Sequence, residues 1–231
     1  MRGVIAKGLE TLGLDEGKAE ALEQYGELLL ETNRVMNLTA ITEPEEVATL
    51  HMLDCAALCA RWDFSGKRLI DVGTGAGFPG LVVAILCPDC AVTLLDPLEK
   101  RLKFIQTVID ALGLSNVKLL HSRGEDAGRD KALRERFDFA SARAVAECVI
   151  LGELCLPFVR VGGTFLCMKT VDSQAEIDRA KPLLGQLGGR VGTPWDYAIP
   201  GAQVTHRVWP VAKSSPTPAQ FPRRWNKIKR T

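Results

Sequence analysis

The chain has 231 residues, of which 46% are hydrophobic and 25% charged, and its formal net charge at pH 7 is +1. This composition is typical of a globular protein with a core of useful size, and the near-neutral charge indicates no class of partner by itself. No stretch is apolar over the length of a membrane span, and the N-terminus lacks the apolar core of a secretory signal. We therefore expect a cytoplasmic protein with no membrane partner.

Residues 16–60 are predicted to be helical, because apolar residues such as Leu22, Tyr25 and Leu29 recur at helical spacing. Glycines and the sequence "TEP" at 42–44 divide this run into several helices, and proline suits the first turn of a helix. We interpret residues 1–64 as a helical cap on a larger domain.

Strands and helices alternate from residue 67 onward. Strands are predicted at 68–73, 91–96, 117–122, 137–144, 162–169, 189–200 and 206–213, and helices at 78–87, 99–114, 146–159 and 175–188. Such alternation predicts an α/β fold with a mostly parallel sheet of seven strands and helices on both faces, here over residues 65–212. The last two strands are expected to run antiparallel and to close the sheet.

The remaining residues, 213–231, read as a linker and a basic tail. The stretch "KSSPTPAQFP" is rich in proline, serine and threonine, which favours a linker. The tail contains five cations and no acid, so it is a candidate for contact with nucleic acid, although a solubilising tail is the simpler interpretation.

A glycine-rich loop follows the first strand, in the sequence "LIDVGTGAGFPGLVVAI" at 69–85. Ligands of parallel sheets bind at the carboxyl ends of the strands, so Gly73, Gly75 and Gly77 mark the expected ligand position. A tight turn without a ligand would need fewer glycines. The loop lacks the Lys-Ser/Thr pair of a triphosphate-binding loop, and its match to the dinucleotide pattern G-x-G-x-x-G is weak by itself.

Three carboxylates narrow the choice of ligand. Asp71 stands directly before the glycines, where a carboxylate suits an ammonium group, such as that of S-adenosylmethionine, better than a pyrophosphate. Asp96, at the end of the second strand, can accept hydrogen bonds from ribose hydroxyls of either ligand. Glu125 and Gly124 follow the third strand and are expected to border an adenine ring. A methyl donor is therefore favoured, with a nicotinamide dinucleotide as the alternative.

Six segments stand in the order and spacing of one family: "NLTAI" at 37–41, "HMLDC" at 51–55, "IDVGTGAGFPGLVVAI" at 70–85, "LLDPLEKRLKFI" at 94–105, "HSRGED" at 121–126 and "SARAVAE" at 141–147. The chain resembles the ribosomal small-subunit methyltransferase G family, also called glucose-inhibited division protein B, over nearly its whole length. The resemblance implies the Rossmann-like fold of class I S-adenosylmethionine-dependent methyltransferases. It also implies methyl transfer to N7 of one guanine in 16S ribosomal RNA.

Carried over by position, the resemblance implies which residues bind the methyl donor: Asp71, Gly73, Gly75, Gly77 and Phe78 in the first loop, Asp96 at the ribose, Gly124 and Glu125 at the adenine, and Arg143 beside the donor and the reaction site. Two positions depart from the family pattern. Lys169 is followed by Thr170 where many members have glycine, and "AGFPG" replaces the commoner "PGFPG" or "PGLPG". Neither departure removes a group that the reaction needs.

Guanine N7 carries a free lone pair and no proton, so its methylation needs positioning and no general base. Arg143 is expected to position a phosphate, a donor carboxylate or a base oxygen, and a purely structural ion pair is its alternative role. The alternative functions are methyl transfer to another RNA, a protein or a small molecule, and a non-catalytic nucleoside-binding regulator.

Several cations are candidates for contact with RNA. His51 and Asp54 share one helix face and either dock the cap on the sheet or border the RNA entrance. The other candidates are Arg123, Lys100, Arg101, Arg223, Arg224, Lys227, Lys229 and Arg230. A solvated surface explains the cluster at 100–103 equally well. The expected partner is 16S ribosomal RNA or the small ribosomal subunit, bound by a monomer.

The seven cysteines are an odd number scattered through apolar segments, which favours reduced, buried thiols over a disulfide framework. Cys87 and Cys90 form a C-x-x-C sequence, and with Cys55 and Cys59 they could supply four thiolates to zinc. The helical placement of these residues is unlike a zinc knuckle, so we expect no metal.

Overall fold

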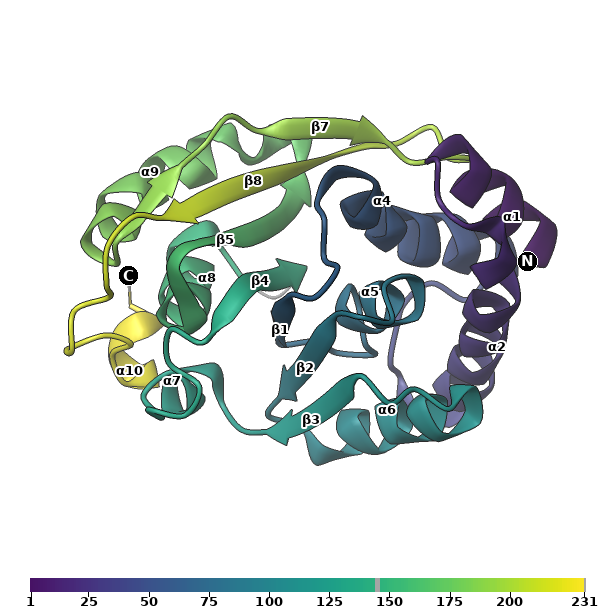
Figure 1. The fold of residues 1–231 in the computed structure, drawn as a ribbon, viewed down its shortest axis with the longest axis horizontal. Coiled ribbons are helices and arrows are strands. Elements are labelled where there is room, and N and C mark those ends of the chain that lie inside the picture. Colours follow the sequence, from purple (N-terminus) through teal and green to yellow (C-terminus); the bar gives the residue numbers. More distant parts are fainter. Residues whose placement is uncertain (144–145, 231) are drawn as a thin grey trace.

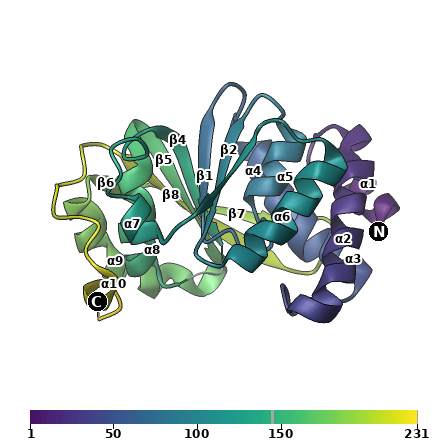
Figure 2. The same ribbon diagram turned by 90° about the horizontal axis from the view of Figure 1, so that it is seen from below.

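The computed structural model describes residues 1–143 and 146–230, which form a sheet between two layers of helices (Figure 1). In Figure 2 the sheet is seen between the two helical layers. One layer contains α1 (Arg2–Thr11), α2 (Ala19–Met36), α3 (Pro44–Glu46), α4 (Asp54–Arg61), α5 (Gly80–Leu86) and α6 (Glu99–Leu112). The other contains α7 (Gly124–Ala127), α8 (Cys148–Cys155), α9 (Gln174–Gln186) and α10 (Trp225–Ile228). Each layer buries its own apolar cluster against the sheet.

The sheet has the order β3-β2-β1-β4-β5-β8-β6, and β7 also pairs with β8. Its strands are β1 (Arg68–Val72), β2 (Ala91–Asp96), β3 (Val117–His121), β4 (Phe137–Arg143), β5 (Val159–Thr170), β6 (Gly189–Val191), β7 (Trp195–Ala198) and β8 (Thr205–Lys213). Strands β1 to β5 are parallel, and β8 is antiparallel to β5. The predicted α/β fold is thereby confirmed. The strand order reverses beside β1, so the carboxyl ends of β1 and β4 form a switch point where ligands bind in such sheets.

The predicted count of seven strands is wrong, because the described residues form eight. The strand expected over 189–200 is two strands, β6 and β7, which pair with successive parts of β8. Four positions separate Val191 from Trp195, whereas three separate their partners Val211 and Val208, so one residue is extra. Pro194 has no N–H to donate, which prevents a continuous ladder across this step.

The N-terminal cap contains one helix more than the periodicity indicated, because α1 precedes the predicted helical run. Pro44 is the first residue of α3, in agreement with the prediction. A π-helical segment, η2 (Val47–Leu53), joins α3 to α4, and it packs against α1 and α2. Shorter turns of 3-10 helix lie at η1 (Glu16–Lys18), η3 (Leu156–Phe158) and η4 (Val171–Ser173).

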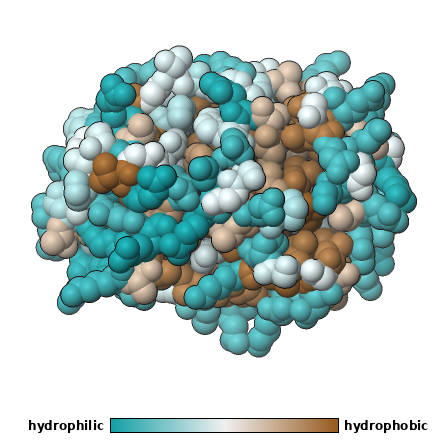
Figure 3. Space-filling view, in the orientation of Figure 1, coloured by the Kyte–Doolittle hydropathy of each residue, from teal (hydrophilic) through white to brown (hydrophobic). Residues whose placement is uncertain are grey.

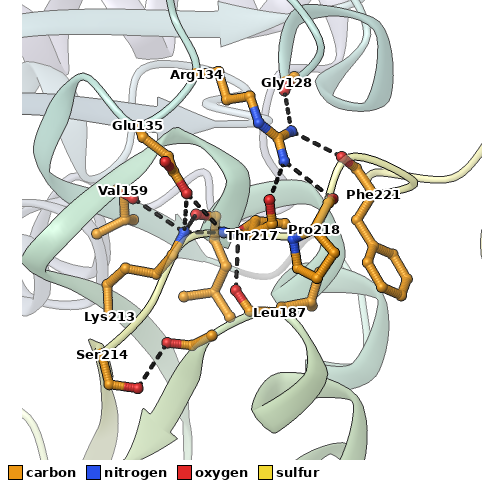
Figure 4. Close-up of polar contacts among 12 residues, drawn as sticks. Gly128, Arg134, Glu135, Val159, Leu187, Lys213, Ser214, Thr217, Pro218 and Phe221 are labelled. Atoms are coloured by element: carbon orange, nitrogen blue, oxygen red, sulfur yellow. Dashed lines mark hydrogen bonds and ion pairs between the residues drawn. The ribbon is translucent and has the colours of Figure 1, made fainter.

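The segment interpreted as a linker is packed against the domain (Figure 4). The Arg134 guanidinium donates to the carbonyl oxygens of Thr217, Pro218 and Phe221. The fully buried Lys213 donates to the Leu156 and Val159 carbonyls and to the Thr217 hydroxyl, and burial lowers its pKa to about 8. These bonds hold the segment in place, so it is not a free tether.

The start of the basic tail is also anchored. Arg223 makes a two-pronged ion pair with Glu153, with Nη2–Oε2 at 2.6 Å and Nε–Oε1 at 2.9 Å, and the Glu153 side chain is fully buried. Ile228 in α10 is buried in the same apolar cluster as α8 and α9. The tail residues up to 228 are therefore part of the folded domain.

Figure 3 shows the surface in the orientation of Figure 1. This face is mainly hydrophilic, and its apolar residues gather in a recess over α4 and α5. Within the described residues, no helix combines the length and apolar character that crossing a membrane requires.

Candidate functional site

A cavity of about 390 Å³ lies beside the glycine loop, at the carboxyl ends of β1, β2 and β4. Five of the predicted donor-binding residues line it: Gly73, Gly75, Phe78, Asp96 and Arg143. So do His51 and Arg101, which were predicted as RNA contacts. The sheet's switch point therefore does carry a ligand-sized cavity.

The loop backbone turns at glycines that adopt positive φ, with 71° at Gly73 and 62° at Gly75. The Gly75 N–H donates to Asp96 Oδ2 at 3.0 Å, and Tyr25 of α2 donates its hydroxyl hydrogen to the Ala76 carbonyl at 2.7 Å. Gly77 does not line the cavity. A Cβ there would lie 2.7 Å from the Tyr25 hydroxyl oxygen, so this glycine allows the cap to approach the loop.

Asp71 lies beneath the loop and is fully buried. One of its oxygens accepts from the Ser141 hydroxyl at 2.8 Å, and the other accepts from the Gly80 N–H at 3.1 Å. Burial raises the pKa of Asp71. The side chain is not among those that line the cavity, and its hydrogen bonds join β1, β4 and α5. Its contact with an ammonium group of the donor stays a prediction.

Asp96 lies at the floor of the cavity. Its Oδ1 accepts from the Leu98 N–H at 2.8 Å, and its Oδ2 accepts from Gly75 and from Arg101, whose Nη1 is 3.3 Å away. A carboxylate has about four acceptor sites, so capacity remains for a ligand hydroxyl. The prediction that Asp96 binds ribose stays a prediction, and the structure gives it a suitable position.

Thr74 adds a polar group that the sequence analysis missed. Its buried Oγ1 lies within reach of the Asp71 carboxylate, and Thr74 lines the cavity. A hydroxyl has one hydrogen to donate and two acceptor sites, so Thr74 can also contact a polar ligand group at the cavity wall. Threonine between two glycines looks like ordinary turn sequence, so no local signal distinguished it.

Arg143 ends β4 and joins the cap to the cavity. Its Nη1 donates to Asp54 Oδ2 at 2.8 Å and to the Leu50 carbonyl at 2.9 Å, and its guanidinium lies 5.0 Å from the Phe78 ring centroid. Burial disfavours the charged form, but the neighbouring Cys55 and Asp54 outweigh it, and the pKa of Arg143 is raised. The sequence analysis gave a structural ion pair and a position beside the reaction site as alternative roles of Arg143. The side chain forms the ion pair and also lines the cavity.

His51 lines the same cavity, and its ring stacks on Phe78 with centroids 4.6 Å apart. Arg143 Nη2 lies 2.9 Å from Nδ1, and Thr39 Oγ1 lies 2.8 Å from Nε2. Because a guanidinium only donates, Nδ1 must accept and Nε2 carries the hydrogen, so the ring is neutral. Burial and the Arg143 charge lower the pKa of His51 to about 4.

Asp54 is fully buried and accepts from three distant elements. Besides Arg143 of β4, its Oδ1 accepts from the Tyr197 hydroxyl of β7 at 2.7 Å and from His206 Nδ1 of β8 at 2.8 Å. These bonds support the interpretation that His51 and Asp54 dock the cap on the sheet, and the interpretation that they border the RNA entrance stays a prediction.

The other predicted residues lie outside the cavity. Gly124 and Glu125 do not line it, and Glu125 is buried against Arg123, with Nε–Oε1 at 2.7 Å. Their contact with adenine stays a prediction. Arg123 also lies 5.5 Å from the Trp225 ring centroid. Exposed cations occur at Lys100, Arg224, Lys227, Lys229 and Arg230.

The seven cysteines are free thiols. In the parts of the chain that the structure describes, no group of three or more Cys, His, Asp or Glu side chains could hold a metal ion. The alternative zinc site of Cys55, Cys59, Cys87 and Cys90 therefore has no structural support. Two residues of the "SARAVAE" segment, Ala144 and Val145, lie outside the described residues.

Comparison with known proteins gives matches over nearly the whole chain. The sequence model of the family GidB, described as rRNA small subunit methyltransferase G, matches residues 18–190. A ribosomal RNA small subunit methyltransferase G from Clostridium perfringens is 43% identical over 224 residues, which are 96% of this chain and 94% of that protein. The protein of that name from Alkaliphilus metalliredigens is 40% identical over 225 residues, again 96% and 94%.

Among solved structures, a 16S rRNA (adenine(1408)-N(1))-methyltransferase from Catenulisporales acidiphilia, solved with its cosubstrate SAM, superposes with a TM-score of 0.53. The match covers 67% of this chain and 88% of that chain at 17% identity. The shared fold is that of the class I methyltransferases.

Proposed function

This chain belongs to the rRNA small subunit methyltransferase G family, and we propose that it transfers a methyl group from S-adenosylmethionine to N7 of a guanine in 16S ribosomal RNA. The observation that carries the proposal is the cavity at the switch point of a class I methyltransferase fold. It combines a glycine turn, the Asp96 carboxylate and the Thr74 hydroxyl. These groups fit a ligand that has ribose hydroxyls and polar termini.

In this proposal, different residues of the cavity bind different parts of the donor. The glycine turn lets the backbone approach a ligand closely, since no side chain stands between them. Asp96 retains acceptor capacity for ribose hydroxyls, and Thr74 offers a hydroxyl to a polar group of the donor. When bound, S-adenosylmethionine supplies an electrophilic methyl group.

The acceptor needs no proton removed, so the protein's contribution is positioning. Arg143 is held by Asp54, Leu50 and His51 and cannot swing freely, which fixes one edge of the cavity. Its charge faces a donor and a product that both carry positive charge. The buried Asp54 carboxylate compensates this charge, and His51 stays neutral, so the cavity edge does not accumulate cations.

We propose that RNA contacts the exposed cations Lys100, Arg224, Lys227, Lys229 and Arg230. We also propose that the chain acts as a monomer in the cytoplasm, where its free thiols stay reduced. Sedimentation equilibrium of the purified protein tests the monomer, and a stable dimer at micromolar concentration would contradict it.

The first test is methyl transfer from labelled S-adenosylmethionine to 16S ribosomal RNA, presented naked and in small subunits, with the labelled nucleotide identified after digestion. A single labelled N7-methylguanosine is expected. Label in another nucleotide, or no transfer while donor binding persists, would overturn the proposed acceptor.

Donor binding is tested separately by calorimetry with Asp96→Asn. The variant loses the charge that accepts the ribose hydroxyls, so the donor dissociation constant should rise about 10-fold or more. Asp110→Asn is the matched control, since Asp110 is an exposed carboxylate of α6 that contacts Gln106. Equal affinities for both variants would contradict the assignment of the cavity.

A further inference from the structure

A second cavity, of about 310 Å³, meets the first at Arg143. Its other lining residues include Asp54, Met168, Lys169, Glu176 and His206. Arg143 lines both cavities, so a base in the second cavity would lie next to a donor in the first. The volume is within the range of pockets that bury small ligands, about 300–1,000 Å³.

Lys169 of β5 and Glu176 of α9 form an ion pair in this cavity, with Nζ–Oε1 at 2.6 Å. Their side chains are 15% and 20% exposed, so both charges are largely withdrawn from water. Although burial opposes it, the Lys169 hydrogen bond and the Cys148 N–H lower the pKa of Glu176. Burial likewise opposes the charge on Lys169, and the bond to Glu176 raises its pKa. The pair is therefore ionised at neutral pH.

Each member of the pair keeps unused hydrogen-bonding capacity. Lys169 donates to Glu176 Oε1 and to the Ala146 carbonyl, which occupies two of the three ammonium hydrogens. Glu176 accepts from Lys169 and from the Cys148 N–H at Oε1, and the Cys148 thiol also contacts the carboxylate. A carboxylate has about four acceptor sites, so capacity remains for a further donor. The cavity wall thus presents one cationic donor beside one anionic acceptor.

This pattern is complementary to the Watson–Crick edge of guanine. Guanine presents the O6 acceptor directly beside the N1–H donor, whereas adenine presents an N6 amino donor beside an N1 acceptor. A guanine would form hydrogen bonds at both atoms. An adenine would place its N6 amino donor against the Lys169 donor and its N1 acceptor against the Glu176 acceptor. Adenine also has an N7 lone pair, so an enzyme acting at N7 must recognise other atoms, such as those at positions 6 and 1, to select guanine.

Resting on the proposed function, we propose that the Lys169–Glu176 pair selects the acceptor base: Lys169 donates to guanine O6, and Glu176 Oε2 accepts from N1–H. The base enters the second cavity unstacked from the RNA, with N7 toward Arg143 and the donor. Glu176 is a specificity-determining residue in this arrangement, and Lys169 both positions it and contacts the base.

The test is a cycle of two enzymes and two acceptors. The acceptor guanosine is replaced by 2-aminopurine riboside in ligated 16S RNA. This analogue keeps N7 and the 2-amino group but lacks O6 and N1–H. Wild-type protein and Glu176→Gln are compared by kcat/KM for methyl transfer to each RNA. In the variant, an uncharged amide replaces the carboxylate that accepts from N1–H.

The guanine-to-analogue ratio of kcat/KM should be larger for wild type than for Glu176→Gln by about 5- to 100-fold, the range of a two-bond base contact. Asp178→Asn, an exposed carboxylate on the same helix that pairs with Lys181, makes the same change in charge and should keep the wild-type ratio. A merely structural role of Glu176 would lower both activities equally and leave the ratio unchanged, which would overturn the inference.

Donor affinity distinguishes the possible failures. Glu176→Gln should bind S-adenosylmethionine as wild type does, because Glu176 does not line the donor cavity. Should the variant prove unfolded, Lys169→Met supplies the same comparison through O6. If wild type makes no N7-methylguanosine at all, the proposed function fails. If it does and the ratio is equal in the variants, only the inference about base selection fails.

Discussion

The neutral state of His51 makes a quantitative prediction about stability and pH. In the unfolded chain its pKa is about 6.5, and in the folded protein it is about 4, because burial and Arg143 disfavour the imidazolium. Protonation would place an N–H on Nδ1, directly against the Arg143 guanidinium 2.9 Å away. At pH values between these two pKa values, His51 therefore binds a proton in the unfolded chain and does not bind it in the folded chain.

The sign of the effect follows from linkage. The contribution of the neutral His51 ring to the free energy of unfolding is complete above about pH 6.5. It falls as the pH is lowered toward 4, by about 1.4 kcal/mol for each pH unit. From pH 7.5 to pH 5, His51 alone should cost about 2 kcal/mol. Asp54 and Glu176 have lowered pKa values, so these carboxyls titrate below this range. Asp71 has a raised pKa and acts in the opposite direction, but wild type and His51→Gln share it, so a comparison of the two cancels its effect.

The assay is urea denaturation of wild type, His51→Gln and His121→Gln at pH 7.5 and at pH 5. Glutamine does not titrate, so His51→Gln should lose about 2 kcal/mol less than wild type between the two pH values. His121 is exposed, and its replacement reports what any loss of a histidine does. If wild type and His51→Gln show the same pH dependence, the neutral, Arg143-bound ring is the wrong description.

Three further predictions concern other parts of the chain. Gly77→Ala places a Cβ 2.7 Å from the Tyr25 hydroxyl at a φ of 110°, so the free energy of unfolding should fall by about 1–3 kcal/mol and donor binding should weaken. Thermal melts and calorimetry measure the two effects, and the control is Gly113→Ala, which is also at positive φ but in open space. Glu153→Gln breaks the pair with Arg223 and should cost about 3 kcal/mol, with faster amide exchange in α10; unchanged exchange would show that the pair does not hold the tail. Replacing the four exposed tail cations by glutamine should reduce the salt slope of RNA binding by about 3 and leave donor affinity unchanged, whereas an equal slope would exclude phosphate contact by Arg224, Lys227, Lys229 and Arg230.

Most of the sheet could be predicted because its strands are continuous apolar runs bounded by glycine and polar turns. The prediction failed at 189–200, where Gly192 and Pro194 divide an apparently single strand. It also missed α1, whose sequence contains two glycines and gives a weak helical signal. Gly8 of α1 allows close packing on Leu53, since a Cβ there would lie 2.2 Å from Leu53 Cδ1. This helix therefore depends on a tertiary contact.

In the candidate site, too, some residues could be predicted from the sequence and others could not. The glycine loop and Asp96 were identified because their spacing follows directly from a strand–turn–helix unit. Thr74 and Tyr25 were missed, and Asp71 was expected to face the ligand. Whether a carboxylate points to the cavity or beneath the loop depends on its partners Ser141 and Gly80, and the sequence does not show which of them will be near.

The sequence by itself determined the α/β architecture, the position of the ligand loop and the family. Periodicity and motif spacing are local, and they need no knowledge of what lies across the molecule. The tertiary structure alone decided that Asp54, Arg143 and His206 meet, and that Lys169 and Glu176 face a cavity beside them. These residues come from separate elements, and their charges and pKa values depend on burial and on neighbours that only the folded chain brings together.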